Sequence, residues 1–106
     1  MRPAATALKY DGITAAGLDA YEERIAIYNR DGGRCRTCGE PVAFDAFELA
    51  HRIANTKANR KRWGPAIIDH PLNRVVAHPG RCNSAQNIGG SPGACAELIK
   101  QIQEDL

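Results

Sequence analysis

The chain has 106 residues, of which 43% are hydrophobic and 25% are charged, and its formal net charge is +2. These values are typical of one small folded domain, exclude disordered and fibrous proteins, and do not by themselves indicate a nucleic-acid partner. The chain has no apolar run long enough to span a membrane and no N-terminal apolar stretch typical of a secretory signal, so we expect a cytoplasmic protein.

The N-terminal part is predicted to contain an arm and one helix. Residues 1–17 show no apolar periodicity, so we assign them to an arm and residues 18–106 to the folded domain. Apolar side chains then recur at intervals of three and four residues, namely Leu18, Tyr21, Ile25 and Tyr28. This spacing predicts a helix that ends near Arg30, where Asp31-Gly32-Gly33 stops it, because glycine accepts the conformation that terminates helices.

The central part predicts a β-hairpin. Residues 47–51 and residues 74–78 are two short segments rich in strand formers. The polar segment 55–63 between them is expected to form a short helix that ends at Gly64. We interpret Trp63 as an anchor in a small core rather than as a platform for stacking bases.

The C-terminal part predicts two further helices. Residues 82–88 read as a short helix that ends at a pair of glycines. Ser91 followed by Pro92 is a good N-cap and first-turn pair for a terminal helix. The apolar face of that helix is formed by Cys95, Leu98, Ile99 and Ile102.

The cysteines indicate a metal site. Cys35 and Cys38 are spaced so that one turn can direct both sulfurs at a single ion, and a cytosolic protein keeps its thiols reduced. His78 and Cys82 form a second short-spaced pair, so we predict a structural Zn²⁺ with a Cys3His ligand set. Two alternatives remain open here: Cys95 could replace His78, or the first two cysteines could be a redox couple.

Five basic residues lie within eleven positions, namely Arg52, Lys57, Arg60, Lys61 and Arg62. Such a run is either a solvated face or a set of phosphate contacts, and composition alone does not separate the two readings.

The ordered combination of motifs resembles the HNH endonuclease family. The resemblance covers roughly residues 20–90 and lies in Cys35-x-x-Cys38, Leu49-Ala50-His51-Arg52-Ile53, Pro71-Leu72-Asn73-Arg74-Val75-Val76 and Cys82-Asn83-Ser84-Ala85-Gln86-Asn87. It implies the α+β fold called ββα-metal, in which flanking helices and a zinc ion hold a two-stranded antiparallel hairpin. It also implies metal-dependent hydrolysis of DNA, by a monomer or a homodimer.

The resemblance assigns roles to individual residues. His51 would be the general base that takes a proton from the attacking water, and Asn73 would fix the loop that orients it. Asn83 would bind a catalytic Mg²⁺ or Mn²⁺, together with Asn87, which is four residues further on and is therefore expected on the same helix face. The five basic residues would then border the active site and contact phosphates.

One position departs from the family pattern. The residue before the base histidine is usually a metal ligand, and here it is Ala50. Glu48, Asp69 or His70 could supply the missing ligand, or the substrate phosphate and water could bind most of the ion. The alternative reading is a zinc-stabilised nucleic-acid-binding module without catalysis. A small redox protein is a weaker third reading, because it leaves His51 and the two asparagines unexplained.

Overall fold

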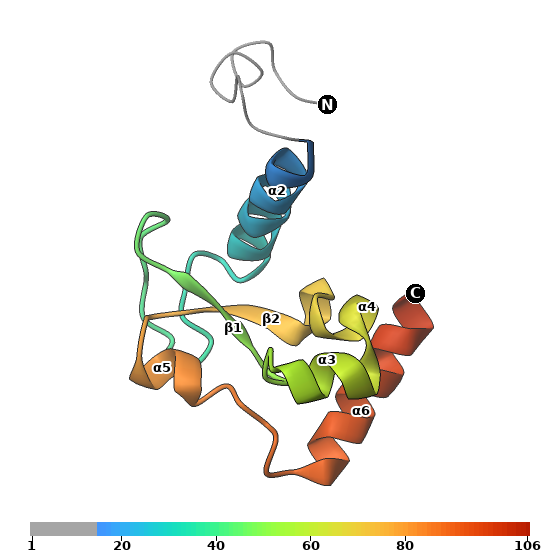
Figure 1. The fold of residues 1–106 in the computed structure, drawn as a ribbon. Helices are drawn as coiled ribbons and strands as arrows, with labels where there is room; N and C mark the ends of the chain where they lie inside the picture. Colours follow the sequence, from blue (N-terminus) through green and yellow to red (C-terminus); the bar gives the residue numbers. More distant parts are fainter. Residues whose placement is uncertain (1–14) are drawn as a thin grey trace.

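The computed structural model describes residues 15–106, so most of the predicted arm lies outside the described residues (Figure 1). Helix α2 spans Ala15–Arg30 and begins three residues before the predicted start. The remaining elements are β1 (Glu48–His51), α3 (Lys57–Trp63), α4 (Pro65–Ile68), the 3-10 helix η1 (Pro71–Asn73), β2 (Arg74–Ala77), α5 (Arg81–Ser84) and α6 (Pro92–Asp105). Among these described residues, no helix has the length and apolar character needed to cross a bilayer.

The two strands form the predicted antiparallel hairpin, and they lie at the centre of the molecule in Figure 1. Leu49 pairs with Val76, and Ala50 pairs with Val75. Because side chains alternate along a strand, the two pairs face opposite sides of the hairpin. The second strand ends at residue 77, which leaves His78 in the loop that leads to α5.

Three small apolar clusters surround the hairpin. On the Leu49 side the buried members are Ile27, Val42, Phe47 and Val76. On the other side they are Cys35, Ala50, Val75 and Ala77. Beyond the end of the hairpin, α4 and α6 meet in a cluster of Ile53, Ile67, Ile68, Leu98, Ile99 and Ile102, and Trp63 packs against it. The expectation that Trp63 is a core anchor is therefore confirmed.

Local hydrogen bonds explain where the short helices begin and end. The Ser91 hydroxyl accepts a hydrogen bond from the Ala94 backbone N–H at 3.3 Å, which confirms the predicted N-cap of α6. Helix α5 is shorter than predicted, because it ends at Ser84 instead of continuing to residue 88. The Ile88 backbone N–H donates to the Arg52 carbonyl at 2.9 Å, so the chain leaves the helix and crosses to the end of β1.

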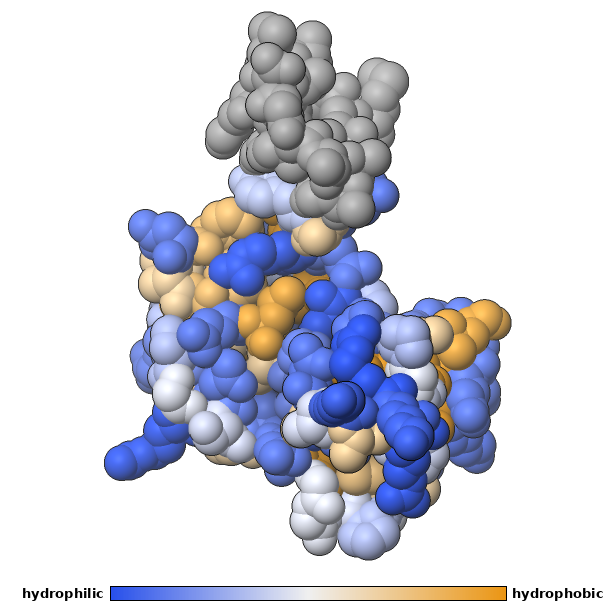
Figure 2. Space-filling model, in the orientation of Figure 1, coloured by the Kyte–Doolittle hydropathy of each residue, from blue (hydrophilic) through white to orange (hydrophobic). Residues whose placement is uncertain are grey.

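The surface facing the viewer in Figure 2 is mainly hydrophilic, and apolar atoms show in the region between α2 and the hairpin. Four aromatic side chains gather in edge-on and tilted contacts there, namely Tyr21, Tyr28, Phe44 and Phe47. The guanidinium of Arg24 lies 3.7 Å from the centre of the Phe47 ring. These contacts attach α2 to the segment that leads into β1.

Candidate functional site

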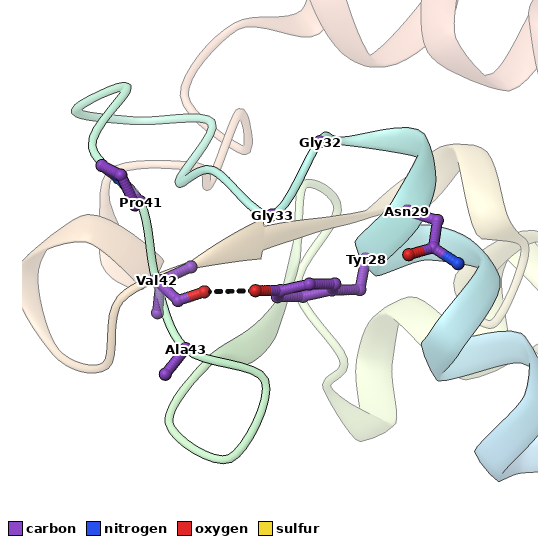
Figure 3. A pocket seen from close by; sticks show the side chains of 7 residues that line it. All are labelled: Tyr28, Asn29, Gly32, Gly33, Pro41, Val42 and Ala43. Atoms are coloured by element: carbon purple, nitrogen blue, oxygen red, sulfur yellow. Dashed lines mark hydrogen bonds between the residues drawn. The ribbon is translucent and has the colours of Figure 1, made fainter.

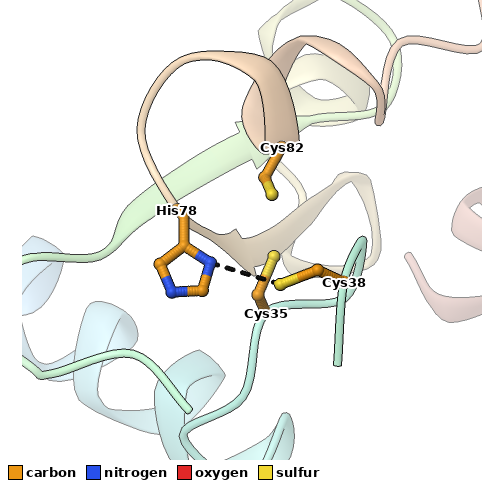
Figure 4. A group of neighbouring side chains, drawn as sticks. All are labelled: Cys35, Cys38, His78 and Cys82. Carbon is orange, nitrogen blue, oxygen red and sulfur yellow. Dashed lines mark hydrogen bonds between the residues drawn. The ribbon is translucent and has the colours of Figure 1, made fainter. Parts of the chain in front are cut away.

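Four side chains that were predicted to bind zinc lie together (Figure 4). Their ligand atoms, from Cys35, Cys38, His78 and Cys82, are all within 4.8 Å of one another. The first two residues come from the loop after α2, and the last two come from the end of β2 and the start of α5. The cluster therefore connects the segment that leads into β1 with the segment that follows β2. The prediction of a Cys3His ligand set is confirmed at the level of geometry.

A hydrogen bond at Nε2 orients the His78 imidazole so that its other nitrogen, Nδ1, faces the cysteine sulfurs. Its Nε2 lies 3.2 Å from the Pro41 carbonyl oxygen, and its Nδ1 lies 3.4 Å from the Cys38 sulfur. A carbonyl oxygen only accepts, so Nε2 carries the proton, and Nδ1 keeps its lone pair for a metal.

The thiols of the cluster perturb one another. Burial opposes ionisation of Cys35, but backbone N–H groups at Cys38, His78 and Thr37 lower its pKa to about 5. Burial, together with the neighbouring Cys35 and Cys38, raises the pKa of Cys82 to about 11. Three thiolates at this separation repel one another in the absence of a cation, so full ionisation of the set requires a positive ion at its centre.

The donor set and its surroundings fit a structural zinc ion. Zinc prefers four nitrogen or sulfur ligands in a tetrahedron, and this cluster offers four and no more. The side of the hairpin next to it is lined by small residues such as Ala50 and Ala77, which bury little apolar area. Cys95, the alternative ligand, lies elsewhere, where its sulfur donates to the Ile88 carbonyl at 3.3 Å.

A polar cleft of about 290 Å³ lies between β1 and α5. Its lining residues are Leu49, His51, Ala54, Asn55, Asn83, Ser84 and Asn87. Three residues with a predicted role in catalysis, His51, Asn83 and Asn87, therefore share one cavity. Asn87 reaches the cleft from the loop after α5, so the prediction that it shares a helix face with Asn83 was wrong although the two residues do converge.

The imidazole of His51 is half-buried at the end of β1. Burial lowers its pKa from the ordinary value of 6.5, with a smaller opposing effect from Asp69 and a further lowering effect from Arg60. A pKa below 6.5 means that the ring is mainly neutral at pH 7. A neutral imidazole has a free lone pair and can accept a proton.

We expect an NMR titration to show this displacement. The ring signals of His51 should change over a pH range centred below 6.5, because desolvation penalises the charged form. The measurement is the ring-proton chemical shift of zinc-loaded protein between pH 4.5 and 8.5, with His51→Gln used to assign the signal. A midpoint above 6.5 would contradict the electrostatic picture.

Asn73 holds the loop that follows His51. Its side chain is fully buried and does not line the cleft. Its Oδ1 accepts from the Ile53 backbone N–H at 2.7 Å, and its Nδ2 donates to the carbonyls of Ile53 and Ile68 at 3.1 and 2.9 Å. These hydrogen bonds agree with the prediction that Asn73 fixes the loop after His51. Because the side chain is fully buried, it could contact a substrate only if this loop unfolded.

We expect Asn73→Ala to destabilise the zinc-loaded protein by about 3 kcal/mol, because three buried backbone groups lose their partners. Urea denaturation measures this loss. Asn59→Ala is the matched control, since its side chain makes one bond to a carbonyl, at 2.9 Å to Ala54, and should cost about 1 kcal/mol. Equal losses in the two variants would show that Asn73 is not a special anchor.

A carboxylate lies beside Asn83. The Asn83 Nδ2 donates to the Glu48 Oε1 at 2.8 Å, so α5 and β1 are joined at the edge of the cleft. Among the described residues, the amide Oδ1 of Asn83 has no partner and is free to bind a cation. Glu48 lies on the same side of β1 as Ala50, two residues earlier in the strand.

The other predicted substitutes for the missing ligand do not line the cleft, although Asp69 is close enough to His51 to affect its pKa. Asp69 receives both terminal nitrogens of Arg60, at 2.8 and 2.9 Å, and this pair lowers the pKa of its carboxyl. His70 uses both ring nitrogens, one toward Asp105 at 2.8 Å and one as acceptor for the Leu72 N–H at 3.1 Å. Neither residue lines the cavity that contains His51.

The basic run does not form one surface around the cleft. Arg60 is bound to Asp69 and Asn55, and Arg52 lines a different cavity. The expectation that the whole run borders the active site was therefore wrong for Arg52. Helix α3 carries the other four basic residues, and its N-cap, Thr56, directly follows the cleft residue Asn55.

A larger cavity of about 630 Å³ lies near α2 (Figure 3). The Tyr28 hydroxyl crosses it to donate to the Val42 carbonyl at 2.6 Å. Gly33 borders it with a φ of +67°, and a Cβ there would lie 3.0 Å from the tyrosine oxygen. The lining has no histidine, carboxylate or lysine, so this cavity lacks a general base such as the one that His51 gives the smaller cleft.

Sequence reasoning missed the role of Asp31, which it treated as part of a helix end. The carboxylate is fully buried and accepts from Arg30, from Arg36 and from the Val76 backbone N–H at 2.9 Å. Burial opposes its ionisation, but these donors together hold its pKa below the ordinary value. The signal was its place immediately before the glycines and close to several arginines, but its strand partner could not be read from the sequence.

Comparison with protein-family models, with curated proteins and with solved structures found no match for this chain. The structure itself shows an α+β domain with a two-stranded antiparallel hairpin, flanking helices and a Cys3His cluster. These features are compatible with the resemblance to the HNH family.

Proposed function

We propose that the protein is a divalent-metal-dependent HNH endonuclease that hydrolyses DNA phosphodiester bonds in the cleft between β1 and α5. The observation that carries this proposal is the shared cleft, which contains His51, Asn83 and Asn87, three of the four residues to which the family resemblance gives a catalytic or metal-binding role. The Cys3His cluster supports it, because zinc there would fix α5 against the hairpin and so fix Asn83 relative to His51.

The polar groups of the cleft suit a phosphate. Asn55 and Asn87 each use their Oδ1 as an acceptor, toward Arg60 at 3.1 Å and toward the Gly89 N–H at 2.8 Å. Their amide N–H groups remain as donors, and the Ser84 hydroxyl is a third donor in the same lining. These neutral donors could form hydrogen bonds with the oxygens of a phosphodiester next to the half-buried imidazole. The lining has no carboxylate that would repel the phosphate.

In the proposed reaction, His51 takes a proton from a water molecule as the water oxygen bonds to phosphorus. The bond from phosphorus to the leaving deoxyribose oxygen breaks, and solvent water protonates that oxygen. The products are a phosphomonoester and an alcohol. Asn73 contributes indirectly by holding the backbone that follows His51.

The oxygen donors at the edge of the cleft fit a hard divalent cation, for which carboxylate and amide oxygens are suitable ligands. Glu48 and the free Oδ1 of Asn83 would hold the ion, and the 2.8 Å hydrogen bond from the Asn83 Nδ2 to Glu48 already brings the two side chains together. When bound, Mg²⁺ or Mn²⁺ would stabilise the charge that develops on the phosphate and leaving oxygen. Glu48 would thereby replace the ligand that Ala50 cannot provide.

Incubation of zinc-loaded protein with supercoiled plasmid tests this function. We expect nicked or linear plasmid with Mg²⁺ or Mn²⁺ and none with a chelator that leaves the zinc in place. Filter retention of the same DNA is measured in parallel. Salt-sensitive retention without cleavage under any of these metals would reject the enzyme and support the alternative, a DNA-binding module on an HNH scaffold.

A further inference from the structure

A third cavity, of about 220 Å³, lies beside β2 and shares no lining residue with the His51 cleft. Its lining is formed by Arg30, Arg36, Arg52, Leu72, Val75, Leu98 and Gln101. His51 and Arg52 are neighbours in the chain, and neighbouring residues of an extended segment point to opposite sides. The base histidine and the arginine after it therefore serve different cavities.

The charge around this cavity is unbalanced. Three arginines line it, and two of them, Arg30 and Arg36, form ion pairs with the fully buried carboxylate of Asp31. Because its donors keep the pKa of Asp31 low, this group counts as one negative charge against three positive charges. Glu97 on α6 is not a lining residue, and its Oε1 accepts a hydrogen bond from the Gln101 Nε2 at 3.3 Å.

The three arginines differ in what they have left to donate. Arg30 is held in place by Asp31 and by the carbonyls of Pro71 and Arg74, at 3.0 and 2.7 Å. Arg36 uses one terminal nitrogen on Asp31, and 53% of its side chain is exposed. Among the described residues, the guanidinium of Arg52 has no hydrogen-bond partner. Arg36 and Arg52 thus each have guanidinium N–H groups that are free to donate into one small cavity.

We propose that this arginine cavity binds a phosphate group. Planar guanidinium donors match the oxygens of a phosphate and form charge-assisted bonds with it. The phosphate could belong to a nucleic-acid backbone or be free in solution, and both would make the same contacts. In the first case the inference extends the proposed nuclease, because nucleic acid would contact the domain at a site separate from the cleft that cuts it.

An NMR titration of zinc-loaded protein with inorganic phosphate, at constant ionic strength, tests the cavity. We expect saturable shifts of the backbone signals of Arg36, Arg52 and Val75. In Arg52→Ala the affinity for phosphate should fall about tenfold, which is the effect of one charge-assisted hydrogen bond. Lys100→Ala is the matched control, because it removes one exposed positive charge next to Gln101 without altering the lining. The proposal would be overturned if the signals of Arg36, Arg52 and Val75 in the parent showed no saturable shifts. It would also be overturned if Arg52→Ala bound phosphate as tightly as the parent.

A single-stranded oligonucleotide distinguishes the two sources of the phosphate. If it displaces inorganic phosphate from the cavity, the ligand is a backbone phosphate. Arg52→Ala should then reduce the slope of the logarithm of DNA affinity against the logarithm of salt concentration by about one. If phosphate binds and DNA does not compete, the ligand is free phosphate. Neither arm measures cleavage, so a failure of the nuclease proposal in the plasmid assay would be seen separately.

Discussion

His51→Ala is expected to lower the rate of plasmid cleavage by 100-fold or more, because general-base catalysis contributes roughly 10²–10⁴-fold to such reactions. The ring is half-buried in the cleft and its pKa is lowered by burial, so the parent protein has the neutral base at pH 7. The measurement is the single-turnover rate at saturating protein with Mn²⁺. Added imidazole should restore part of the rate, since the space left by the side chain opens to the cleft.

The control for this experiment is Gln103→Ala, an exposed position on α6. It is purified in the same way and should cut at the parental rate, which shows that the loss of cleavage in His51→Ala comes from position 51 and not from the purification of a variant. Zinc content and far-UV circular dichroism should be unchanged in both variants. Cleavage by His51→Ala at the parental rate would remove His51 from the mechanism.

Loss of the metal cluster is expected to have the largest effect on folding. Cys38→Ser should abolish stoichiometric zinc binding, and most of the protein should then lack a cooperative thermal transition. Structural zinc contributes about 10–16 kcal/mol in small zinc-finger peptides, which equals or exceeds the roughly 5–15 kcal/mol stability of a typical domain. The neighbouring apolar cluster consists of small residues and cannot replace this contribution.

Cys95→Ser provides a matched control, because it makes the same chemical change outside the cluster. It should keep one zinc per chain and a melting temperature within a few degrees of the parent. The comparison uses metal analysis after dialysis and thermal unfolding. Equal zinc loss in Cys38→Ser and Cys95→Ser, or a parent protein that holds no zinc, would contradict the assignment.

The metal ligands could be predicted from the sequence because their spacing is local. Cys35 and Cys38 fit one turn, and His78 and Cys82 fit one loop, so only the meeting of the two pairs depended on the fold. The two strand segments and the Ser91 N-cap were predictable for the same reason. Thr56 was not identified as a cap in advance, but its hydroxyl accepts the Asn59 N–H at 3.1 Å, as the capping preference of threonine would suggest.

The features that were missed depend on contacts between distant parts of the chain. The role of Asn73 in fixing the loop was predicted, but its complete burial and its hydrogen bonds to Ile53 and Ile68 were not. Helix α5 ends early because Ile88 bonds to the Arg52 carbonyl. The side of the hairpin on which the Arg52 side chain lies follows from strand register, which the short segments did not specify.

The central claim is that the cleft between β1 and α5 cuts DNA with His51 as its base. The most direct measurement is the rate at which zinc-loaded parent and His51→Ala convert supercoiled plasmid to nicked plasmid in the same Mn²⁺ buffer. We predict nicking by the parent and almost none by the variant. Equal nicking by both proteins, or intact plasmid with both, would contradict the claim.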